Sequence, residues 1–589
     1  MSGESGVGGV DGLSLCGGSG MGSPEAASVT GATAVRAAGA APAVRVRNLV
    51  VGFGPQGEVN PVLNGVSFEV APGECLAIVG ESGSGKSVTA RSLLGLAGDT
   101  AWVSADELSL AGSDVRGLSE QQWRRWRGRH VGLVLQDALV SLDPLRPVGR
   151  EIADSLRLHT RLSAAERHAR VLEVLHQVGL PDAANQVRKR SGELSGGQRQ
   201  RALIAAAIAM DPPLLIADEP TTALDVTVQA QILDLLATLK RAGTGILLIS
   251  HDLAVVGRIA DRIAVLSEGR IVEEGPAREV LTRPEHPVTR KMLAAIPVDK
   301  PRGLRLSPRD SAPVSPSSAL PAFADRVDRA IVLEATGLVK RFSRPNETEQ
   351  VAVDGVSFRL ERGTTLGIVG ESGSGKTTTA RLALALIRPD AGQVRVLGQA
   401  FSNVSEKQRR LLRPRLGAVY QDALSSFDPR LSVDEVLRDA VGGGTGRAGR
   451  GGASATRLRV LALLDAVGLA QGLLGRRPLS LSGGQRQRVS IARALASGPE
   501  ILICDEPVSS LDVTVQAQVL DLLDELQRDR GLSLLFISHD LGVIQHVSDQ
   551  VAVMLDGRIV ETGAAAQVFG APEHPYTQAL LGAVPRIGF

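Results

Sequence analysis

The amino-acid sequence predicts an α/β fold that occurs twice along the chain. The first observation is the length of 589 residues, which exceeds the size of one ordinary core. The second is that four separate motifs recur in the same order 287 to 290 positions later. The third is that short apolar runs alternate with helical stretches in both halves, as around a largely parallel sheet. Tandem duplication of a domain of about 250 residues accounts for all three.

The composition excludes several classes of protein. The chain has 65 Lys and Arg against 63 Asp and Glu, and a net charge of +2 is not that of a dedicated nucleic-acid binder. Its three cysteines cannot build a disulfide framework, which fits a reducing compartment. Because no window approaches the ~18 unbroken apolar residues of a membrane span, we do not expect the chain to cross a bilayer alone.

We divide the chain into four segments. Residues 1–43 are rich in Gly, Ala and Ser and carry no signal-peptide pattern, which predicts a disordered tail. Residues 44–297 and 331–589 are the two predicted domains. Between them, residues 298–330 hold five prolines among Ser, Arg and Asp, which predicts a linker rather than a packed element. A glycine-rich stretch at 442–452 predicts a surface loop within the second domain.

Short apolar runs predict the strands of each domain. Val44–Phe53 and Ile331–Phe342 are expected to be strands that enter the two domains. The runs expected to be buried strands are Cys75–Val79, Leu214–Ala217 and Ile246–Ile249 in the first domain, and Leu366–Val369, Ile501–Cys504 and Leu534–Ile537 in the second. Val228–Arg241 has the apolar spacing of a helix.

The strongest motif is a glycine-rich loop between a predicted strand and a predicted helix (Ser87–Leu96 or Thr377–Leu386). It reads GESGSGKS in the first domain and GESGSGKT in the second. Backbone N–H groups of such a loop point at phosphate oxygens, the lysine reaches the β- and γ-phosphates, and the hydroxyl ligates Mg²⁺. Two matches in register predict two nucleoside-triphosphate sites. The residues expected to bind phosphate are Gly80, Ser82, Gly83, Gly85, Lys86 and Ser87, and Gly370, Ser372, Gly373, Gly375, Lys376 and Thr377.

An acidic pair follows a predicted strand in each domain, Asp218-Glu219 in the first and Asp505-Glu506 in the second. An aspartate at the end of a strand beside the phosphate loop is where Mg²⁺ is held, and the adjacent glutamate can polarise the attacking water. The alternative interpretation is that these residues cap a helix or turn a loop.

A histidine and a glutamine complete each predicted constellation. His251 and His539 follow apolar strands and could donate a hydrogen bond to the γ-phosphate. Gln136 and Gln421 follow another apolar stretch, where an uncharged amide could touch Mg²⁺ or water. Each of these residues taken alone would have a structural role as its alternative.

Together these motifs resemble those of the nucleotide-binding domain of the ATP-binding cassette (ABC) superfamily. The distinguishing motif is LSGGQ, at Leu194–Gln198 and Leu481–Gln485. The D-loops match as well, as Ala223-Leu224-Asp225 and Ser510-Leu511-Asp512. The resemblance covers nearly all of both domains. It implies that each is a RecA-like α/β core with a helical signature subdomain, and that the chain hydrolyses ATP.

The family pairs its domains head to tail, so that each ATP lies between one domain's phosphate loop and the other's signature. The serine and glycines of the signature precede a helix expected from Gln198 onward, and a helix N-terminus favours anions. One implied site combines Lys86, Ser87, Gln136, Asp218, Glu219 and His251 with Ser482, Gly483 and Gly484. The other combines Lys376, Thr377, Gln421, Asp505, Glu506 and His539 with Ser195, Gly196 and Gly197. Since neither set is degenerate, both sites are expected to be competent.

An aromatic residue upstream of the phosphate loop stacks on adenine in the family. Phe53 and Phe342 match it in position, and the alternative for each is an ordinary core phenylalanine.

The ends of the two domains indicate a subfamily. Glu285–Pro297 and Glu573–Pro585 resemble the tails of ATPases that serve oligopeptide, dipeptide and nickel importers, as do Gln136–Pro144 and Gln421–Pro429. Val288 departs from the usual tyrosine. The resemblance implies two membrane permease subunits that dock at the glutamine regions, an external solute-binding protein, a place on the cytoplasmic side of the cell membrane, and no nucleic-acid partner.

Some relatives carry cysteines after this tail that hold an iron–sulfur centre. Residues 288–330 contain no cysteine, so no cluster is expected. The alternatives to an importer are an exporter ATPase for drugs or antibiotics, and a soluble tandem ABC protein acting on ribosomes or DNA. The proline-rich linker and the scattered cysteines disfavour the soluble protein.

Overall fold

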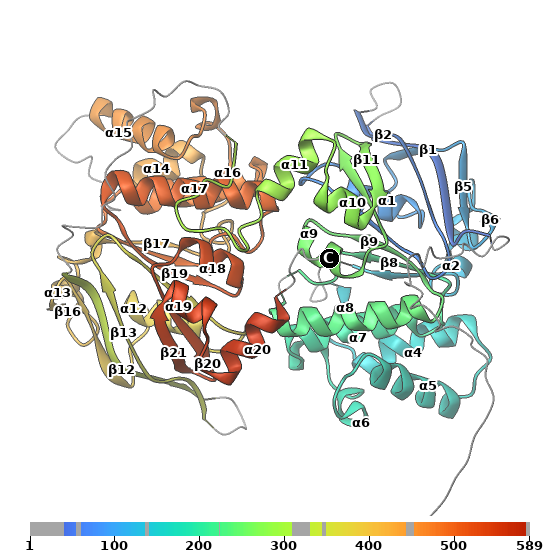
Figure 1. Cartoon of the computed structure of the whole chain (residues 1–589), viewed down its shortest axis with the longest axis horizontal. Coiled ribbons are helices and arrows are strands. Elements are labelled where there is room, and N and C mark those ends of the chain that lie inside the picture. The colour runs from blue at the N-terminus through green and yellow to red at the C-terminus, as the bar shows by residue number, and fades with distance from the viewer. Residues whose placement is uncertain are drawn as a thin grey trace, which may run out of the picture. The chain divides into compact units, whose positions relative to one another are not determined.

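The computed structural model shows a similar succession of elements twice, with β4 and α6 present only in the first half of the described chain (Figure 1). It describes residues 41–54, 60–135, 141–222, 224–308, 330–343, 349–442 and 453–584. We call residues 41–297 the first half and residues 330–584 the second half. The expected N-terminal tail up to residue 40, most of the 442–452 loop and residues 309–329 lie outside the described residues.

The first half contains the following elements. Its strands are β1 (Val44–Phe53), β2 (Asn60–Val70), β3 (Cys75–Val79), β4 (Ala101–Ser104), β5 (Glu107–Leu110), β6 (Ser113–Asp114), β7 (Val131–Val134), β8 (Leu214–Asp218), β9 (Gly245–Ile249), β10 (Arg262–Ser267) and β11 (Arg270–Pro276). Its helices are α1 (Lys86–Ser92), α2 (Glu120–Trp126), α4 (Val148–His159), α5 (Ala164–Gln177), α6 (Ala183–Gln186), α7 (Gly196–Ile208), α8 (Val226–Arg241), α9 (Leu253–Ile259), α10 (Ala277–Thr282) and α11 (Pro287–Ala294).

The second half repeats this order. Its strands are β12 (Ile331–Phe342), β13 (Gln350–Glu361), β14 (Thr365–Val369), β15 (Ala391–Val396), β16 (Gln399–Ala400), β17 (Leu416–Val419), β18 (Ile501–Asp505), β19 (Ser533–Ser538), β20 (Gln550–Leu555) and β21 (Arg558–Ala564). Its helices are α12 (Lys376–Ala383), α13 (Glu406–Arg409), α14 (Val433–Gly442), α15 (Ala453–Ala466), α16 (Gly483–Leu495), α17 (Val513–Arg530), α18 (Leu541–Val547), α19 (Ala565–Gly570) and α20 (Pro575–Ala583).

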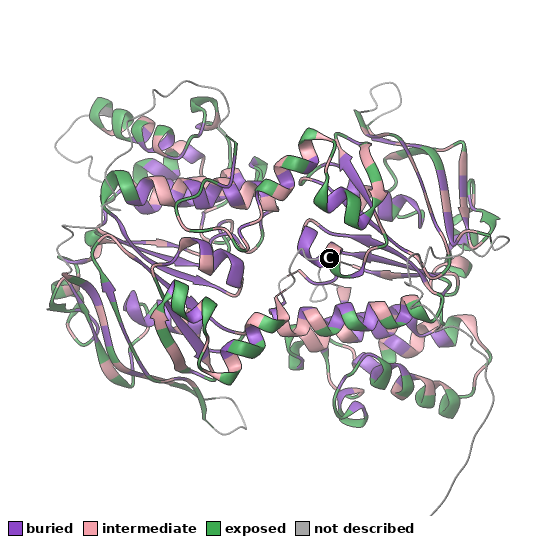
Figure 2. Cartoon of the chain, in the orientation of Figure 1, coloured by how far each residue is buried: buried purple, intermediate pink, exposed green. Residues whose placement is uncertain are grey.

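Each half has a mainly parallel sheet whose central strands are buried on both faces. The strand order is β11-β10-β3-β9-β8-β7 in the first half and β17-β18-β19-β14-β20-β21 in the second, and only the edge strands β11 and β21 run antiparallel to their neighbours. Every residue of β3, β8 and β9 is buried, as the purple strands of Figure 2 show. The predicted α/β class and all six predicted buried strands are therefore confirmed.

A second, antiparallel sheet in each half was not predicted. Its strand order is β2-β1-β5-β6, with β4 also paired to β1, and β13-β12-β15-β16 in the second half. The strands expected at Val44–Phe53 and Ile331–Phe342 are present as β1 and β12, but they belong to this sheet rather than to the parallel one. Its inner face packs on the parallel sheet, because Val44 and Val46 share one apolar cluster with Leu76 and Ile78 of β3.

The helices after the phosphate loops end earlier than predicted. They stop at Ser92 and Ala383, whereas the apolar pattern suggested Leu96 and Leu386. The backbone turns left-handed shortly afterwards, at Gly95 (φ +62°) and Ala385 (φ +50°), which ends the helix. A helical group, formed by α4 to α7 in the first half and α14 to α16 in the second, carries the signature helices α7 and α16 (Figure 1). These two begin at Gly196 and Gly483, two residues before the expected start.

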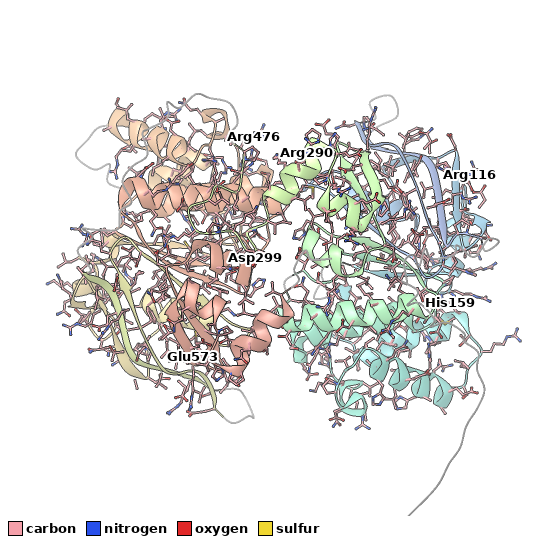
Figure 3. The ribbon with its side chains drawn as sticks, viewed as in Figure 1. Arg116, His159, Arg290, Asp299, Arg476 and Glu573 are labelled. Atoms are coloured by element: carbon pink, nitrogen blue, oxygen red, sulfur yellow. The ribbon has the colours of Figure 1, made fainter. Side chains whose placement is uncertain are left out.

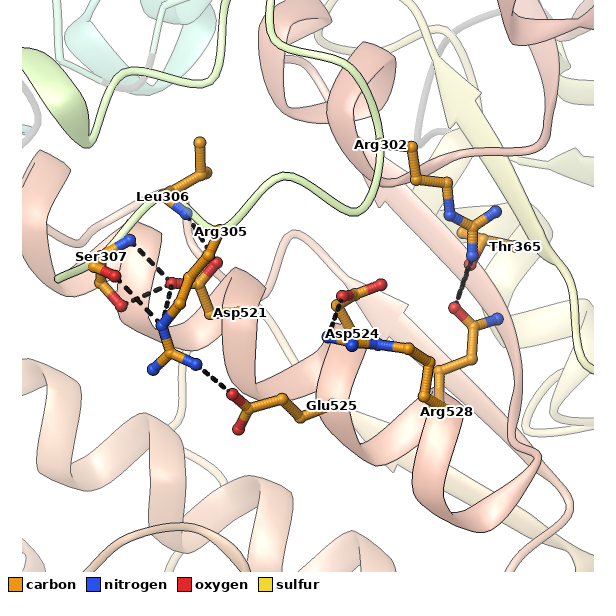
Figure 4. Close-up of polar contacts among 10 residues, drawn as sticks. Arg302, Arg305, Leu306, Ser307, Thr365, Asp521, Asp524, Glu525 and Arg528 are labelled. Carbon is orange, nitrogen blue, oxygen red and sulfur yellow. Dashed lines mark hydrogen bonds and ion pairs between the residues drawn. The ribbon is translucent and has the colours of Figure 1, made fainter. Parts of the chain in front are cut away.

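The start of the expected linker packs against the second half, contrary to the prediction from its proline content. We call residues 298–308 the strap. Leu306 is only 2% exposed and lies in the apolar cluster of the second half. The backbone N–H groups of Leu306 and Ser307 donate to the two carboxylate oxygens of Asp521 on α17, at 2.9 and 2.8 Å (Figure 4). The packing of Leu306 and the hydrogen bonds of two N–H groups therefore hold this segment in place despite its proline content.

Two arginines fasten the strap further. Arg302 donates to Gln527 Oε1 at 2.6 Å and pairs with Asp549. Arg305 pairs with Glu525 (Figure 4). Asp521 is 6% exposed, so its carboxylate depends on the N–H groups of Leu306 and Ser307 for the hydrogen bonds that water would otherwise supply.

Replacing Asp521 is expected to release the strap. Asp521→Ala leaves two buried N–H groups without acceptors, which costs about 1–3 kcal/mol for each group. Tryptic cleavage after Arg302 and Arg305 in the native protein is then expected to accelerate by about tenfold or more. The matched control is Asp524→Ala on the same helix, because among the described residues Asp524 pairs only with exposed Arg528, at 2.7 Å. Equal cleavage rates for both variants would contradict the assigned contacts.

Candidate active site

The phosphate loops connect β3 to α1 and β14 to α12. Each lysine is folded back onto its own loop. Lys86 Nζ donates to the carbonyl oxygens of Gly80 (2.8 Å) and Glu81 (2.9 Å), and Lys376 Nζ donates to those of Gly370 and Glu371 (2.7 Å each). Both lysines are buried, and burial lowers their pKa against the opposing effect of nearby carboxylates. The loops therefore hold a cation at their centre.

Glycine is required where the loop backbone touches its neighbours. At Gly375, φ is +99°, and a Cβ atom would lie 2.3 Å from the carbonyl oxygen of Ala352. At Gly370, a Cβ would lie 2.1 Å from the carbonyl oxygen of Met554. Because both neighbours are backbone atoms, the loop has no room for a side chain at either position.

A hydroxyl and a carboxylate meet beside each lysine. Ser87 Oγ donates to Asp218 Oδ1 at 3.2 Å, and Thr377 Oγ1 donates to Asp505 Oδ1 at 3.1 Å. Burial raises the pKa of both aspartates, and the neighbouring glutamates add to this effect. The donors are hard oxygen atoms, which is the set that Mg²⁺ prefers.

The following glutamate forms an ion pair with the predicted histidine. Glu219 and Glu506 adopt left-handed backbone conformations (φ +50° and +49°). His251 Nδ1 lies 3.1 Å from Glu219 Oε1, and His539 Nδ1 lies 3.2 Å from Glu506 Oε2. Burial opposes ionisation, but the mutual hydrogen bond and charge outweigh it.

The pKa directions in this pair follow from that balance. The pKa of both glutamates is lowered and the pKa of both histidines is raised. The sequence pattern predicts that each histidine lies at the γ-phosphate, but it does not predict the ion pair between the histidine and the glutamate.

Gln421 also reaches the glutamate, because its Nε2 donates to Glu506 Oε2 at 2.8 Å. Its counterpart Gln136 lies outside the described residues.

The signature turns are stabilised as helix N-termini. Ser195 and Ser482 cap α7 and α16 and form capping boxes with the glutamines three residues later. A Cβ atom on Gly484 would lie 2.3 Å from Val515 Cγ1 of α17, and one on Gly197 would lie 2.6 Å from Val228 Cγ1 of α8. The signature helix therefore packs directly on the helix that begins at the D-loop of the same half.

A cavity of about 360 Å³ lies at the first phosphate loop. Its lining brings together Lys86, Ser87, Glu219 and His251 with the second half's D-loop residues 510–512. Among the described residues, the signature turn Ser482–Gly484 is not part of this lining, so its pairing with the first loop stays a prediction. A second cavity, of about 650 Å³, is lined by residues that include Thr377, Gln421 and Asp505.

The two candidate adenine-stacking residues differ in exposure. Phe342 is 43% exposed, and Lys340 Nζ lies 5.7 Å from its ring centroid. Phe53 is half-buried and packs against the core between the two sheets of the first half. Phe342 is therefore the more accessible of the two rings.

Several residues around these sites were not predicted from the sequence. Thr222 Oγ1 donates to Glu219 Oε2 at 3.0 Å. Asp512 was predicted as a D-loop residue, but its place in the lining of the first cavity and its cap on α17 were not predicted. Lys291 and Tyr576, from the tails of the two halves, contact the phosphate loops. The tail motif is visible in the sequence, but on its own it indicates the subfamily and not a contact with the loop.

The glycine loop, the hydroxyl–aspartate pair and the glutamate–histidine pair define a phosphate-loop ATPase, and the signature turn specifies its kind. The chain belongs to the ABC transporter family, whose model matches residues 63–222 and 353–509. A second family model, described as the oligopeptide/dipeptide transporter C-terminal region, matches residues 272–327 and 560–589. As a member of this family the chain binds nucleotide and is an ATPase.

Several relatives are similar over most of the chain. The oligopeptide transport ATP-binding protein OppD of Mycobacterium bovis is 40% identical, over 92% of this chain and 98% of the relative. The peptidoglycan transport ATP-binding protein YejF of Agrobacterium fabrum is 42% identical, over 92% and 96%. The glutathione import ATP-binding protein GsiA of Escherichia coli is 41% identical, over 92% and 89%.

Two kinds of feature are absent from the described residues. None of their helices combines the length and the apolar character that a bilayer span requires. Within the same residues, no group of three or more His, Cys, Asp and Glu side chains forms a candidate metal cluster.

The contact of Gly484 with Val515 predicts a compensating pair of substitutions. Gly484→Ala is expected to lower the stability of the second half by about 1–3 kcal/mol, because the new methyl group overlaps Val515. Val515→Ala in the same chain restores the space, so the double variant is expected to be more stable than the sum of the single effects. Denaturant unfolding of the four proteins checks this. Strict additivity would show that the two side chains do not meet.

Proposed function

We propose that this chain energises the import of peptides through a membrane ABC transporter, with ATP hydrolysed at two sites. The observation that carries the proposal is the pairing of each ATPase half with a tail that matches the oligopeptide/dipeptide transporter C-terminal region. The named transport functions of the relatives, for oligopeptides, peptidoglycan and glutathione, support the same class of solute.

In this proposal, residues 44–297 and 331–589 are the two ATPase domains, joined by a linker at 298–330. Glu219 and Glu506 act as the catalytic carboxylates, which polarise the water that attacks the γ-phosphorus. Their low pKa keeps them ionised and able to accept a proton from water. Because Nδ1 of His251 is engaged by Glu219, Nε2 is the ring nitrogen left to donate to the γ-phosphate.

Lys86 and Lys376 change partners when ATP binds. In the structure their ammonium groups donate hydrogen bonds to carbonyl oxygens of the loop itself. Phosphate oxygens replace these acceptors, so that a buried cation is never left without hydrogen bonds.

The hydroxyl–carboxylate pairs fit a magnesium ion. Ser87 with Asp218, and Thr377 with Asp505, would hold it, with Gln136 and Gln421 as further oxygen donors. Bound Mg²⁺ supplies neutralisation of charge on the β- and γ-phosphates.

The remaining elements of the proposal concern partners and geometry. Two permease subunits would dock at the regions following Gln136 and Gln421, and a solute-binding protein would deliver the peptide, which places the chain at the cytoplasmic face of the cell membrane. The phosphate loop of each half would face the signature turn of the other. The D-loop residues at the first cavity support this head-to-tail pairing.

Glu219→Gln and Glu506→Gln test the catalytic assignment. The amide cannot accept the proton, so hydrolysis is expected to fall about 10²-fold or more while ATP stays bound. Phosphate release and retention of labelled ATP provide the two readouts. Glu279→Gln, at an exposed position of α10, is the matched control. Wild-type hydrolysis in either catalytic variant would refute its role.

Uptake of labelled peptides by cells tests the physiological assignment. Loss of uptake is expected when the chromosomal gene encodes Glu219→Gln together with Glu506→Gln, since the stalled ATPase cannot drive the cycle. Unchanged peptide uptake, with loss of nickel uptake or of drug efflux, would assign the other solute. Co-purification with ribosomes instead of membrane proteins would reject a transporter role altogether.

A further inference from the structure

The phosphate loop of each half is contacted by a helix from the tail of the same half, and the two contacts differ in chemistry. We call α11 and α20 the tail helices. In the first half, Lys291 Nζ on α11 lies 3.1 Å from Glu81 Oε1 of the loop. In the second half, the backbone N–H of Glu371 donates to the hydroxyl of Tyr576 on α20 at 3.1 Å. Val288 occupies the position of Tyr576 in the first half and has no hydroxyl to offer.

The start of each tail helix is anchored to the edge strand of its own half. A carboxylate on that strand, Glu273 or Glu561, accepts hydrogen bonds from the two backbone N–H groups that precede the helix, at 2.8 to 3.1 Å. His286 and His574 then cap the helices, and a proline fills the first helical position. Figure 3 marks Arg290 on α11. The loop contacts therefore come from fixed supports rather than from free chain ends.

The Tyr576 contact acts on the same peptide unit that the phosphate-loop lysine holds. The carbonyl of Gly370 and the N–H of Glu371 belong to one peptide bond, whose oxygen accepts from Lys376. When ATP draws the ammonium group away, the tyrosine contact remains and keeps that peptide plane in place. Burial raises the pKa of Tyr576 to about 12, so its hydroxyl stays neutral.

Each tail helix also contacts the other half. Helix α11 contacts α17, and α20 contacts α8. These are the two helices capped by the D-loop aspartates Asp512 and Asp225. Asp512 itself lines the cavity at the first phosphate loop. A tail helix thus touches the phosphate loop of its own half and the helix that brings the opposing D-loop.

We propose that the tail helices are positioning elements of the two ATP sites, through the Lys291–Glu81 ion pair at the first and the Tyr576–Glu371 hydrogen bond at the second. Each holds its loop in register with the opposing D-loop helix. Because one contact is ionic and the other neutral, the two sites respond differently to salt. The inference rests on the paired sites proposed above and adds residues from the tails to them.

The test is equilibrium binding of the fluorescent nucleotide mant-ATP to the full chain, without magnesium, at about 50 mM and about 500 mM NaCl. Lys291→Ala is expected to weaken one of the two sites about two- to threefold at low salt and not at high salt, because its partly exposed ion pair is screened. Lys291→Arg is expected to retain wild-type binding. Tyr576→Phe is expected to weaken the other site about three- to tenfold at both salt concentrations.

Matched controls lie on the same helices. Arg290→Ala removes a cation next to Lys291 that, within the part of the chain that the structure describes, donates only to the carbonyl oxygens of Pro284 and Glu285. Gln578→Ala removes its counterpart on α20, which bonds to the carbonyl of Pro572. Both controls are expected to bind nucleotide like the wild type. If Lys291→Ala unfolds the helix, Lys291→Gln, which keeps a long side chain, replaces it.

The outcomes separate this inference from the proposed function. Wild-type chain that binds no mant-ATP would refute the paired ATP sites themselves. Wild-type binding at two sites, with Lys291→Ala and Tyr576→Phe no different from their controls, would overturn only the role of the tails. A salt-independent effect of Lys291→Ala would also overturn it, because an ion pair must weaken as salt screens it.

Discussion

The buried ammonium group of the phosphate-loop lysine is the constraint on which the rest of each half depends. A cation only 5–7% exposed must be surrounded by oxygen atoms, and the loop supplies its own carbonyls until phosphates take their place. The loop can curl so tightly only where glycine lies against backbone, as at Gly370 and Gly375. The buried strands β3 and β14 fix the start of the loop, and the parallel strands beside them deliver the aspartate, glutamate and histidine to the same edge of the sheet.

The buried strands of this region follow from the sequence because their determinants are local. An unbroken apolar run, a glycine loop and an acidic pair each lie within a few consecutive residues, and their repetition removes the risk of a chance match. The antiparallel sheet was not predicted because β4 and β6 are short and largely exposed. They show no alternation of apolar and polar residues that would distinguish them from loops. The packing of the strap was not predicted because proline content describes the average of a segment. The position of the strap depends on Leu306 and on two N–H groups. Tyr576 and Glu371 are 205 positions apart, and only the folded tail reveals their contact.

In both halves a tail helix contacts the phosphate loop, but the side chains that make the contact differ. Both anchor the tail on a carboxylate of the edge strand, and both direct one residue of the tail helix to the phosphate loop. The group of candidate site residues described for the second half, with Gln421 on Glu506, is matched in the first by the same types of residue. The tail contacts thus differ between the halves, whereas the candidate site residues beside each phosphate loop are of the same types. Such peripheral differences allow duplicated ATPase units to diverge in regulation while their chemistry is retained.

The strap also favours association between the two halves of one chain over association between halves of separate chains. A tether that fixes the second half to the chain leaving the first raises the effective concentration of each half around the other to about the millimolar range. Encounters between identical halves of separate molecules cannot compete with that concentration at ordinary expression levels. Covalent fusion therefore enforces an unlike pair with a stoichiometry of one to one, which separately encoded subunits could reach only through selective interfaces.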